Sequence, residues 1–244
     1  MTRILVAGII LLNVNLAIAL DLTKISIGGA TDAAKAVTLS NEDVRALSLE
    51  AIKQYDSQNN LASADNKYSK RLARLTKKHV TEDGLDLNFR VYLVDSMNAF
   101  ATADGSIRVF AGLMDKMSDE ELLFVIGHEI GHVKLEHTKA KLKTAYLASA
   151  ARKSTVASGG TAGLIASTEL GGMAESMVNA TYSRKEESNS DRYGVEFMKR
   201  YGYDPAKAVS ALEILAELGD SSSLLASHPA PSKRAKAIAK KYKI

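Results

Sequence analysis

The sequence predicts a mainly helical α+β domain, in which a small antiparallel sheet or hairpin lies beside one buried helix. The buried helix is predicted at residues 118–139, where apolar side chains occupy most sides of a helical pattern. The sheet is predicted because apolar and polar residues alternate from Leu85 to Leu93. The 244 residues are 46% hydrophobic and 25% charged, which suits one globular domain, placed here at residues 40–244.

Residues 1–19 are predicted to be a secretory signal peptide. A basic residue, Arg3, precedes an apolar run, and Ala17 and Ala19 provide the small residues of a cleavage site. An uncleaved membrane anchor is the alternative, but two asparagines interrupt the apolar run. Residues 20–39 show no strong periodicity, so we expect a loosely ordered N-terminal segment there.

Composition narrows the possible partners and location. The chain has no cysteine, which excludes disulfides, thiolate metal sites and lipid attachment through a cysteine at the cleavage point. We therefore expect an exported, periplasmic protein that is not a lipoprotein. The formal net charge is +4, with basic residues gathered at residues 233–244, where a solvated helix face is the interpretation because the chain shows no aromatic-basic platform for nucleic acid. No nucleic-acid partner is expected, and at most peripheral contact with a membrane.

Two helices are predicted before the sheet. The first is capped by Ser40, and its apolar positions share one face: Val44, Leu47, Ala51 and Tyr55. The second shows the same spacing in Tyr68, Leu72, Leu75 and His79. We expect the last of these, His79, at the surface or at the boundary of the core.

A hairpin is predicted between the alternating strand and the buried helix. Asp104 and Gly105 form a strong turn signal, and the return strand is expected from Ile107 to Phe110. The edge of such a sheet can pair with an extended peptide. The hairpin therefore predicts a place for a peptide directly before the buried helix.

The buried helix carries two histidines and a glutamate. Ser118 and Glu121 suit its first turn as a capping box. His128 and His132 are four residues apart, so they lie on one helix face and can bind the same metal ion. Glu129 lies one position round and can reach a water bound there, which is the H-E-x-x-H arrangement of zinc metallopeptidases.

The alternative is a buried helix whose histidines are satisfied by hydrogen bonds. Two histidines and a glutamate inside an apolar helix would need several polar partners, which makes this alternative the weaker one. Gly127 and Gly131 each cost about 1 kcal/mol of helix propensity relative to alanine. Their presence indicates that another segment approaches the helix closely at these positions.

A third metal ligand is not found directly after the second histidine. The metzincin pattern would need glycine at 135 and histidine at 138, where this chain has Leu135 and Thr138. His137 is one residue out of place, and we expect it to face solvent. A distant carboxylate is the other solution, since a catalytic zinc uses three protein ligands.

The region after the buried helix offers such a carboxylate. Residues 140–176 are rich in Ala, Ser, Thr and Gly and are interpreted as helices with a flexible joint, or alternatively as a mobile flap. Residues 172–200 are predicted to form a long helix, on which Glu187 and Asp191 share one face. An exposed charged helix is the alternative.

Together, the H-E-I-G-H run and the segment S-R-K-E-E-S-N-S-D at residues 183–191 resemble the HtpX and CAAX-prenyl-protease family of gluzincin metallopeptidases. That family has H-E-x-x-H followed later by S-R-x-x-E-x-x-A-D, and only Ser190 departs from it here. His228-Pro229 with Arg234 is similar to its H-P-x-x-x-x-R motif. The resemblance covers about residues 40–242 and is closest to soluble exported members implicated in quality control of outer-membrane proteins.

The resemblance implies a zincin-like metallopeptidase domain with one zinc ion per chain, bound by His128, His132 and Glu187. Asp191 would hydrogen-bond a ligand histidine, most simply His128. Glu129 would be the general base. The expected active-site edge strand, which would bind substrate, contains Asn98, Ala99, Phe100 and Ala101.

His228 is expected either to donate a hydrogen bond to the oxyanion as a catalytic residue or to cap the metal at rest, and a loop histidine held by its neighbours is the alternative. The implied substrates are unfolded or misfolded proteins, with envelope assembly proteins as further partners. A chaperone or assembly factor that binds unfolded proteins in the same cleft without cutting them is the alternative function.

Overall fold

The computed structural model describes residues 40–144, 181–217 and 223–244. The predicted signal peptide and the segment after it, at residues 1–39, lie outside the described residues. So does most of the Ala- and Gly-rich region, at 145–176. None of the described helices is long and apolar enough to cross a membrane.

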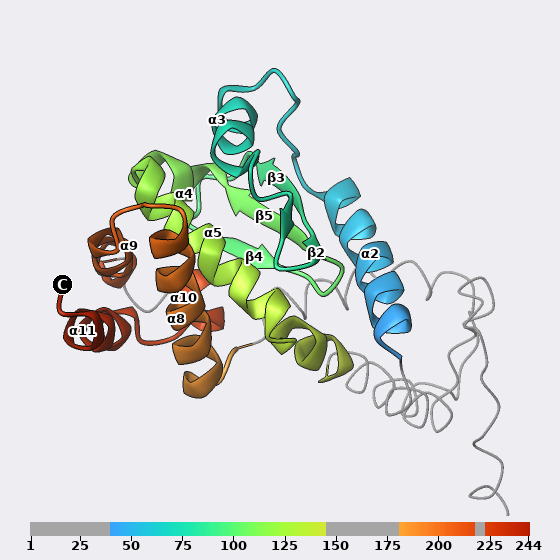
Figure 1. Cartoon of the computed structure of the whole chain (residues 1–244). Coiled ribbons are helices and arrows are strands. Elements are labelled where there is room, and N and C mark those ends of the chain that lie inside the picture. The colour runs from blue at the N-terminus through green and yellow to red at the C-terminus, as the bar shows by residue number, and fades with distance from the viewer. Residues whose placement is uncertain (1–39, 145–180, 218–222) are drawn as a thin grey trace, which may run out of the picture.

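The described chain is mainly helical, and its helices surround a small sheet (Figure 1). In chain order the elements are α2 (Asn41–Gln58), α3 (Lys67–Thr76), β1 (Thr81–Glu82), β2 (Leu85–Asp86), β3 (Asn88–Tyr92), β4 (Ala99–Ala101), β5 (Ser106–Phe110), α4 (Ala111–Lys116), α5 (Asp119–Lys134), α8 (Arg184–Arg200), α9 (Ala206–Ala216), α10 (Ser223–Ser227) and α11 (Pro231–Tyr242). Helix also covers residues 137–144. The predicted mainly helical α+β class is confirmed.

The larger sheet has three strands in the order β3-β5-β4. β4 and β5 form the predicted antiparallel hairpin, and Gly105 at its turn has a φ of 94°, which an L side chain rarely adopts. The prediction of a wholly antiparallel sheet is wrong for one strand, because β3 runs parallel to β5. β3 and β4 flank β5 on opposite sides, so the segment between them crosses over β5. The predicted strand from Leu85 to Leu93 is also divided, and its first part pairs with β1.

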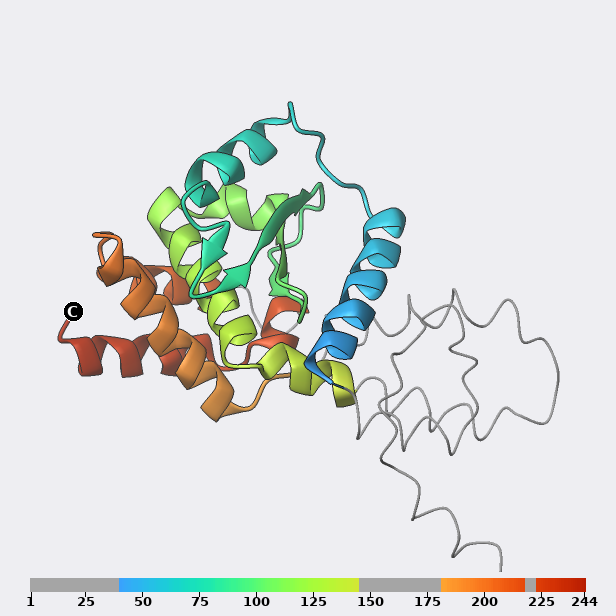
Figure 2. The same cartoon turned by 45° about the vertical axis from the view of Figure 1, so that its right-hand side comes forward.

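The two faces of this sheet are covered by different helices, α2 on one face and α5 on the other (Figures 1 and 2). On the α2 face, Ile52 packs with Tyr92, Phe100 and Phe110. The alternating pattern placed Tyr92 with the polar residues, but it is fully buried because α2 covers that face. Helices thus cover both faces of the sheet, and of its three strands only Asn88 and Arg90 in β3 are exposed, which explains why alternation predicts its burial only in part.

α5 begins as predicted, with a capping box between Ser118 and Glu121. Every residue from Glu121 to Val133 is buried, because the sheet lies on one side of the helix and α8 on another. The second predicted helix, α3, ends at Thr76, so His79 lies beyond it. His79 is fully buried rather than at the surface, because Phe197 and Tyr201 of the α8 end pack on its ring at centroid distances of 4.7 and 4.4 Å.

α5 and α8 approach each other through glycines, as Gly127 and Gly131 led us to expect. A Cβ on Gly127 would stand 2.7 Å from Cδ1 of Phe197, and one on Gly194 would stand 3.2 Å from the backbone nitrogen of His128. Of the helix predicted at 172–200, residues 172–180 lie outside the described residues; residues 181–183 are not helical, and α8 begins at Arg184, where Ser183 and Glu186 form a capping box. The glycines and this cap together determine which part of α8 faces α5.

We predict that Gly127→Ala lowers the free energy of unfolding by about 1–3 kcal/mol, because the added methyl group overpacks against Phe197. At an exposed helix position the same change would stabilise by about 1 kcal/mol. Chemical denaturation of Gly127→Ala, Phe197→Leu and the double variant measures the coupling between the two positions. Since leucine relieves the clash, the double variant should lose less than the two single variants together. Additive losses would contradict this contact.

Candidate metal centre

Three segments bring four potential ligands together: His128 and His132 on α5, Glu187 on α8, and His228 directly after α10. One ligand atom from each lies within 4.8 Å of the others, and all four side chains are buried. Three of the four are the ligands predicted from the sequence. The fourth is His228, which was expected to return to the same cleft.

The separations suit a small tetrahedral site. Nε2 of His128 lies 3.0 Å from Nε2 of His132 and 3.3 Å from Nδ1 of His228. Oε1 of Glu187 lies 3.3 Å from Nε2 of His132 and 3.0 Å from Nδ1 of His228. Four atoms placed about 2.0–2.1 Å from one ion in a tetrahedron are separated by about 3.3 Å. These residues therefore fit a metal ion with nitrogen and oxygen ligands.

Glu129 lies beside this cluster without joining it. Its Oε1 is 3.5 Å from Nε2 of His228, and the side chain is almost completely buried. Its Oε2 has no hydrogen-bond partner among the described residues. A buried carboxylate oxygen without a partner is costly, so it indicates a place for a polar group such as water next to the metal position.

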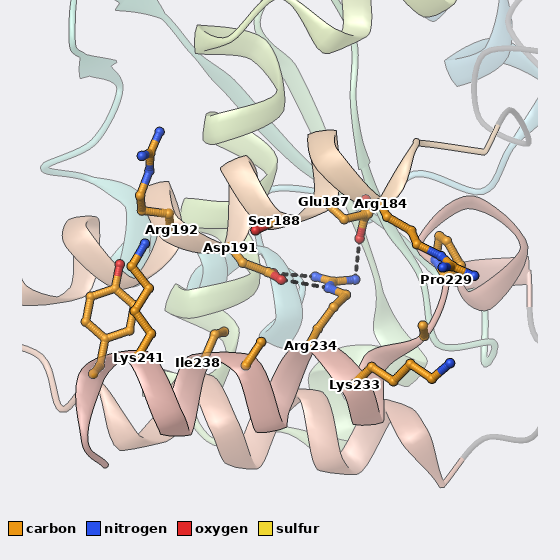
Figure 3. A pocket seen from close by; sticks show the side chains of 13 residues that line it. Arg184, Glu187, Ser188, Asp191, Arg192, Pro229, Lys233, Arg234, Ile238 and Lys241 are labelled. Carbon is orange, nitrogen blue, oxygen red and sulfur yellow. Dashed lines mark hydrogen bonds and ion pairs between the residues drawn. The ribbon is translucent and has the colours of Figure 1, made fainter.

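Asp191 occupies the position predicted for it, behind His128. Its Oδ1 lies 3.0 Å from Nδ1 of His128, on the side of the ring away from the other ligands. Arg234 of α11 donates to both oxygens of Asp191, at 2.9 and 2.6 Å, and also forms an ion pair with Glu187 (Figure 3). Arg234 thus contacts both Asp191, which orients a ligand histidine, and Glu187, which is itself a potential ligand.

The surroundings of the site favour the protonation states in which histidine and carboxylate side chains bind metal cations. Burial lowers the pKa of His132 well below its usual value, so its imidazole is neutral at pH 7. Burial by itself raises the pKa of Glu187, but His228 and Arg234 hold it well below its usual value. Burial acts in the same direction on Asp191, and Arg234 again lowers its pKa. Neutral imidazoles and ionised carboxylates are the forms that coordinate metals.

The prediction that His137 faces solvent is wrong. It is buried, and its Nδ1 lies 3.1 Å from Nδ1 of His132 and 3.3 Å from Oγ of Ser190. The chain turns after α5, with Glu136 at a φ of 59°, and the helix that follows returns His137 to the site. His137 therefore contacts His132 in the way that Asp191 contacts His128, from behind the ligand.

Sequence reasoning also missed Tyr182. Its ring stacks on the ring of His132 at a centroid distance of 3.6 Å, and the ammonium of Lys141 lies 3.5 Å from the centre of the tyrosine ring. The backbone nitrogen of Tyr182 donates to the carbonyl of Ser227, which ties the start of α8 to the residue before His228. The sequence signal for Tyr182 was its position directly before Ser183, because the Ser183 cap determines where the chain enters α8.

The predicted substrate-binding residues are not part of the metal cluster. Ala99, Phe100 and Ala101 form β4, one of the two edge strands of the three-stranded sheet, and all three are buried. Asn98 precedes them, and its buried Oδ1 has no partner among the described residues. The structure thus places these residues at a sheet edge beside α5, while their contact with a peptide stays a prediction.

Comparisons with known proteins agree with a metal site of this geometry. The sequence model of peptidase family M48 matches residues 66–242. Metalloprotease YcaL of Escherichia coli (strain K12) is 39% identical over 219 residues, which cover 88% of this chain and 86% of that protein. Metalloprotease LoiP of the same organism is 36% identical over 215 residues, 87% of this chain and 85% of its own length. The beta-barrel assembly-enhancing protease of Yersinia pestis is 29% identical over 163 residues, 60% of this chain and 33% of its own length.

We predict that Asp191→Ala weakens metal binding by about 10–100-fold, because Nδ1 of His128 loses the acceptor that orients its ring. Competition with a chromophoric chelator measures the affinity. Glu196→Ala, which removes an exposed carboxylate from the same helix, is the matched control and should bind metal as the parent does. Asp191→Asn preserves the shape of the site if the alanine variant does not fold. Unchanged affinity in folded Asp191 variants would show that this residue does not support the metal.

Proposed function

Because the chain belongs to peptidase family M48, we propose that it is an exported zinc endopeptidase that cuts unfolded or misfolded envelope proteins, including proteins of the outer membrane. That it is a metalloprotease follows from the family match and from the buried ligand cluster. The observation that carries the proposed reaction is Oε2 of Glu129, which has no hydrogen-bond partner in the described part of the chain and lies beside the four clustered ligands.

Zinc is the proposed metal, one ion per chain, held by His128, His132 and Glu187. Three nitrogen and oxygen ligands from the protein are typical of catalytic zinc sites, and the chain has no cysteine with which to build a structural one. When bound, zinc supplies a Lewis acid that lowers the pKa of a coordinated water to about 7 and polarises a peptide carbonyl.

The residues of the chain supply the proton transfers. Oε2 of Glu129 is placed to accept a proton from the attacking water, and the same carboxyl group then donates it to the leaving amine. Arg234 and Asp191 keep His128 in one orientation while this happens. The carboxylate is almost completely buried, so bulk water does not compete for the proton.

His228 is proposed to donate a hydrogen bond to the oxyanion that forms as the carbonyl is attacked. Its Nε2 faces Glu129 at 3.5 Å, while its Nδ1 points into the ligand cluster. The same position would allow it to cap the metal as a fourth ligand when no substrate is present. The two roles predict opposite effects of removing the imidazole: activity falls if His228 donates to the oxyanion, and rises if it caps the metal.

The substrate is proposed to lie extended along β4, at Asn98 to Ala101. Backbone pairing with a sheet edge is insensitive to side-chain sequence, which suits an enzyme that acts on many unfolded chains. The name of one relative, a beta-barrel assembly-enhancing protease, supports the proposal that envelope assembly proteins are further partners. The second candidate function, favoured by the same edge strand, is a chaperone that binds unfolded proteins in this cleft without cutting them.

We predict that Glu129→Gln retains zinc and fold but lowers the rate of casein digestion by about 10²–10⁴-fold, because the general base is lost. Glu136→Gln, an exposed glutamate just beyond α5, is the matched control. Zinc content is measured in parallel, and one ion per chain is expected in both variants.

The same experiment separates the enzyme from the chaperone. If the parent and Glu129→Gln are equally inactive, and both prevent aggregation of an unfolded outer-membrane protein, the chaperone function replaces the protease.

We also predict that His228→Ala keeps zinc but loses about 10²–10³-fold in kcat, as expected when one donor to the oxyanion is removed. Single-turnover digestion of a fluorogenic peptide measures this step. A rise in activity would instead identify His228 as an inhibitory fourth ligand.

Export is proposed from the predicted signal peptide. The mature protein should begin at Leu20, directly after the small residues Ala17 and Ala19. N-terminal sequencing of protein isolated from the periplasm checks this. Recovery of Met1 on membrane-bound protein would indicate an uncleaved anchor.

A further inference from the structure

A pocket of about 220 Å³ lies between α8 and α11, behind the metal ligands (Figure 3). Glu187, Asp191 and Arg234 form its inner wall, so the pocket and the metal centre share these side chains. The proposed peptidase reaction uses none of the other residues that line it.

The pocket is strongly basic. Besides Arg234, it is lined by four exposed cations: Arg184 and Arg192 of α8, and Lys233 and Lys241 of α11. The only carboxylates that line it, Glu187 and Asp191, are both paired with Arg234. Within the described residues, none of the four exposed cations forms an ion pair with a carboxylate. The pocket therefore carries positive charge that the protein itself does not neutralise.

The cations stand in two pairs at opposite ends of the pocket. Figure 3 shows Arg184 and Lys233 at one end, Arg192 and Lys241 at the other, with Asp191 and Arg234 between them. On each helix the two cations are eight positions apart, which is a rise of about 12 Å along the helix axis. The two pairs are therefore separated by about this distance. Between them, Ile238 adds an apolar side chain beside Asp191 and Arg234, and Pro229 lies at the end with Arg184 and Lys233. An anionic group at an end and an apolar portion between the ends would match this lining.

We propose that this pocket binds an anionic phospholipid, with the phosphate between a pair of cations and apolar atoms on Ile238 and its neighbours. Anionic lipid surfaces attract lysine and arginine side chains, and in membrane proteins basic pockets between transmembrane helices hold lipid headgroups. The basic surface continues beyond the pocket along α11, in the exposed residues Lys236, Lys240 and Lys243. A membrane surface would engage this wider area, whereas a small phosphate in solution would not.

An acidic peptide fits the pocket less well. Its two walls are helices, whose backbone groups are bonded within each helix, so an extended peptide finds no strand edge to pair with. A helical peptide would need a longer apolar groove than the short floor around Ile238 provides. The lipid proposal is independent of the proposed peptidase reaction, because the four exposed cations assigned to the lipid take no part in the ligand cluster.

The test compares two double variants with the same loss of charge. Arg184→Gln with Lys233→Gln removes one cation pair of the pocket, and Lys236→Gln with Lys240→Gln removes two lysines of α11 outside it. Sedimentation with phosphatidylglycerol-containing vesicles at about physiological salt measures binding, and phosphatidylcholine vesicles show the uncharged background. All forms carry the same N-terminus, and zinc content verifies their fold.

Each double variant removes two surface charges, so both should bind anionic vesicles more weakly than the parent, and the pocket variant should bind about tenfold or more weakly than the control. Equal losses would overturn the proposal, because they indicate a diffuse electrostatic attraction. Free glycerol phosphate that binds without vesicles through the same residues would assign a soluble phosphate ester instead. Decaglutamate that binds through them more tightly than vesicles would assign an acidic protein partner, and either result overturns the lipid proposal.

Discussion

The close approach of α5 and α8 is the constraint on which the rest of the molecule depends. Gly127 and Gly194 remove the side chains that would hold the two helices apart, and Phe197 fills the space beside them. Only at this separation can Glu187 reach the two histidines of α5 within a few ångström. The cost of glycine in two helices is offset by a site that neither helix could form alone.

Each ligand histidine is held from behind by a different kind of partner. His128 meets Asp191, whose charge is balanced by Arg234, while His132 meets His137 and stacks on Tyr182. An imidazole that contacts a carboxylate is a stronger electron donor than one that contacts another imidazole. The two ligands are therefore electronically unequal, although the sequence motif presents them as equivalent.

Much of the fold and the site could be predicted because it depends on local patterns. The capping boxes, the buried α5 and the spacing of His128 and His132 are all properties of neighbouring residues. The errors share a different cause. His79, Tyr92 and His137 are buried by segments distant in the sequence, and a periodic pattern carries no information about what later covers it. The parallel pairing of β3 with β5 likewise depends on a crossover connection, which no turn signal in the sequence indicates.

The segment that closes the site comes from the last part of the described chain. His228 and Arg234 both follow α9, and Arg234 forms ion pairs with two buried carboxylates, Glu187 and Asp191. During synthesis, the H-E-x-x-H helix emerges from the ribosome long before this arginine does. A nascent chain therefore has its metal-binding histidines but not the charge balance of the finished centre. The charge balance of the metal centre can thus form only after synthesis has passed Arg234.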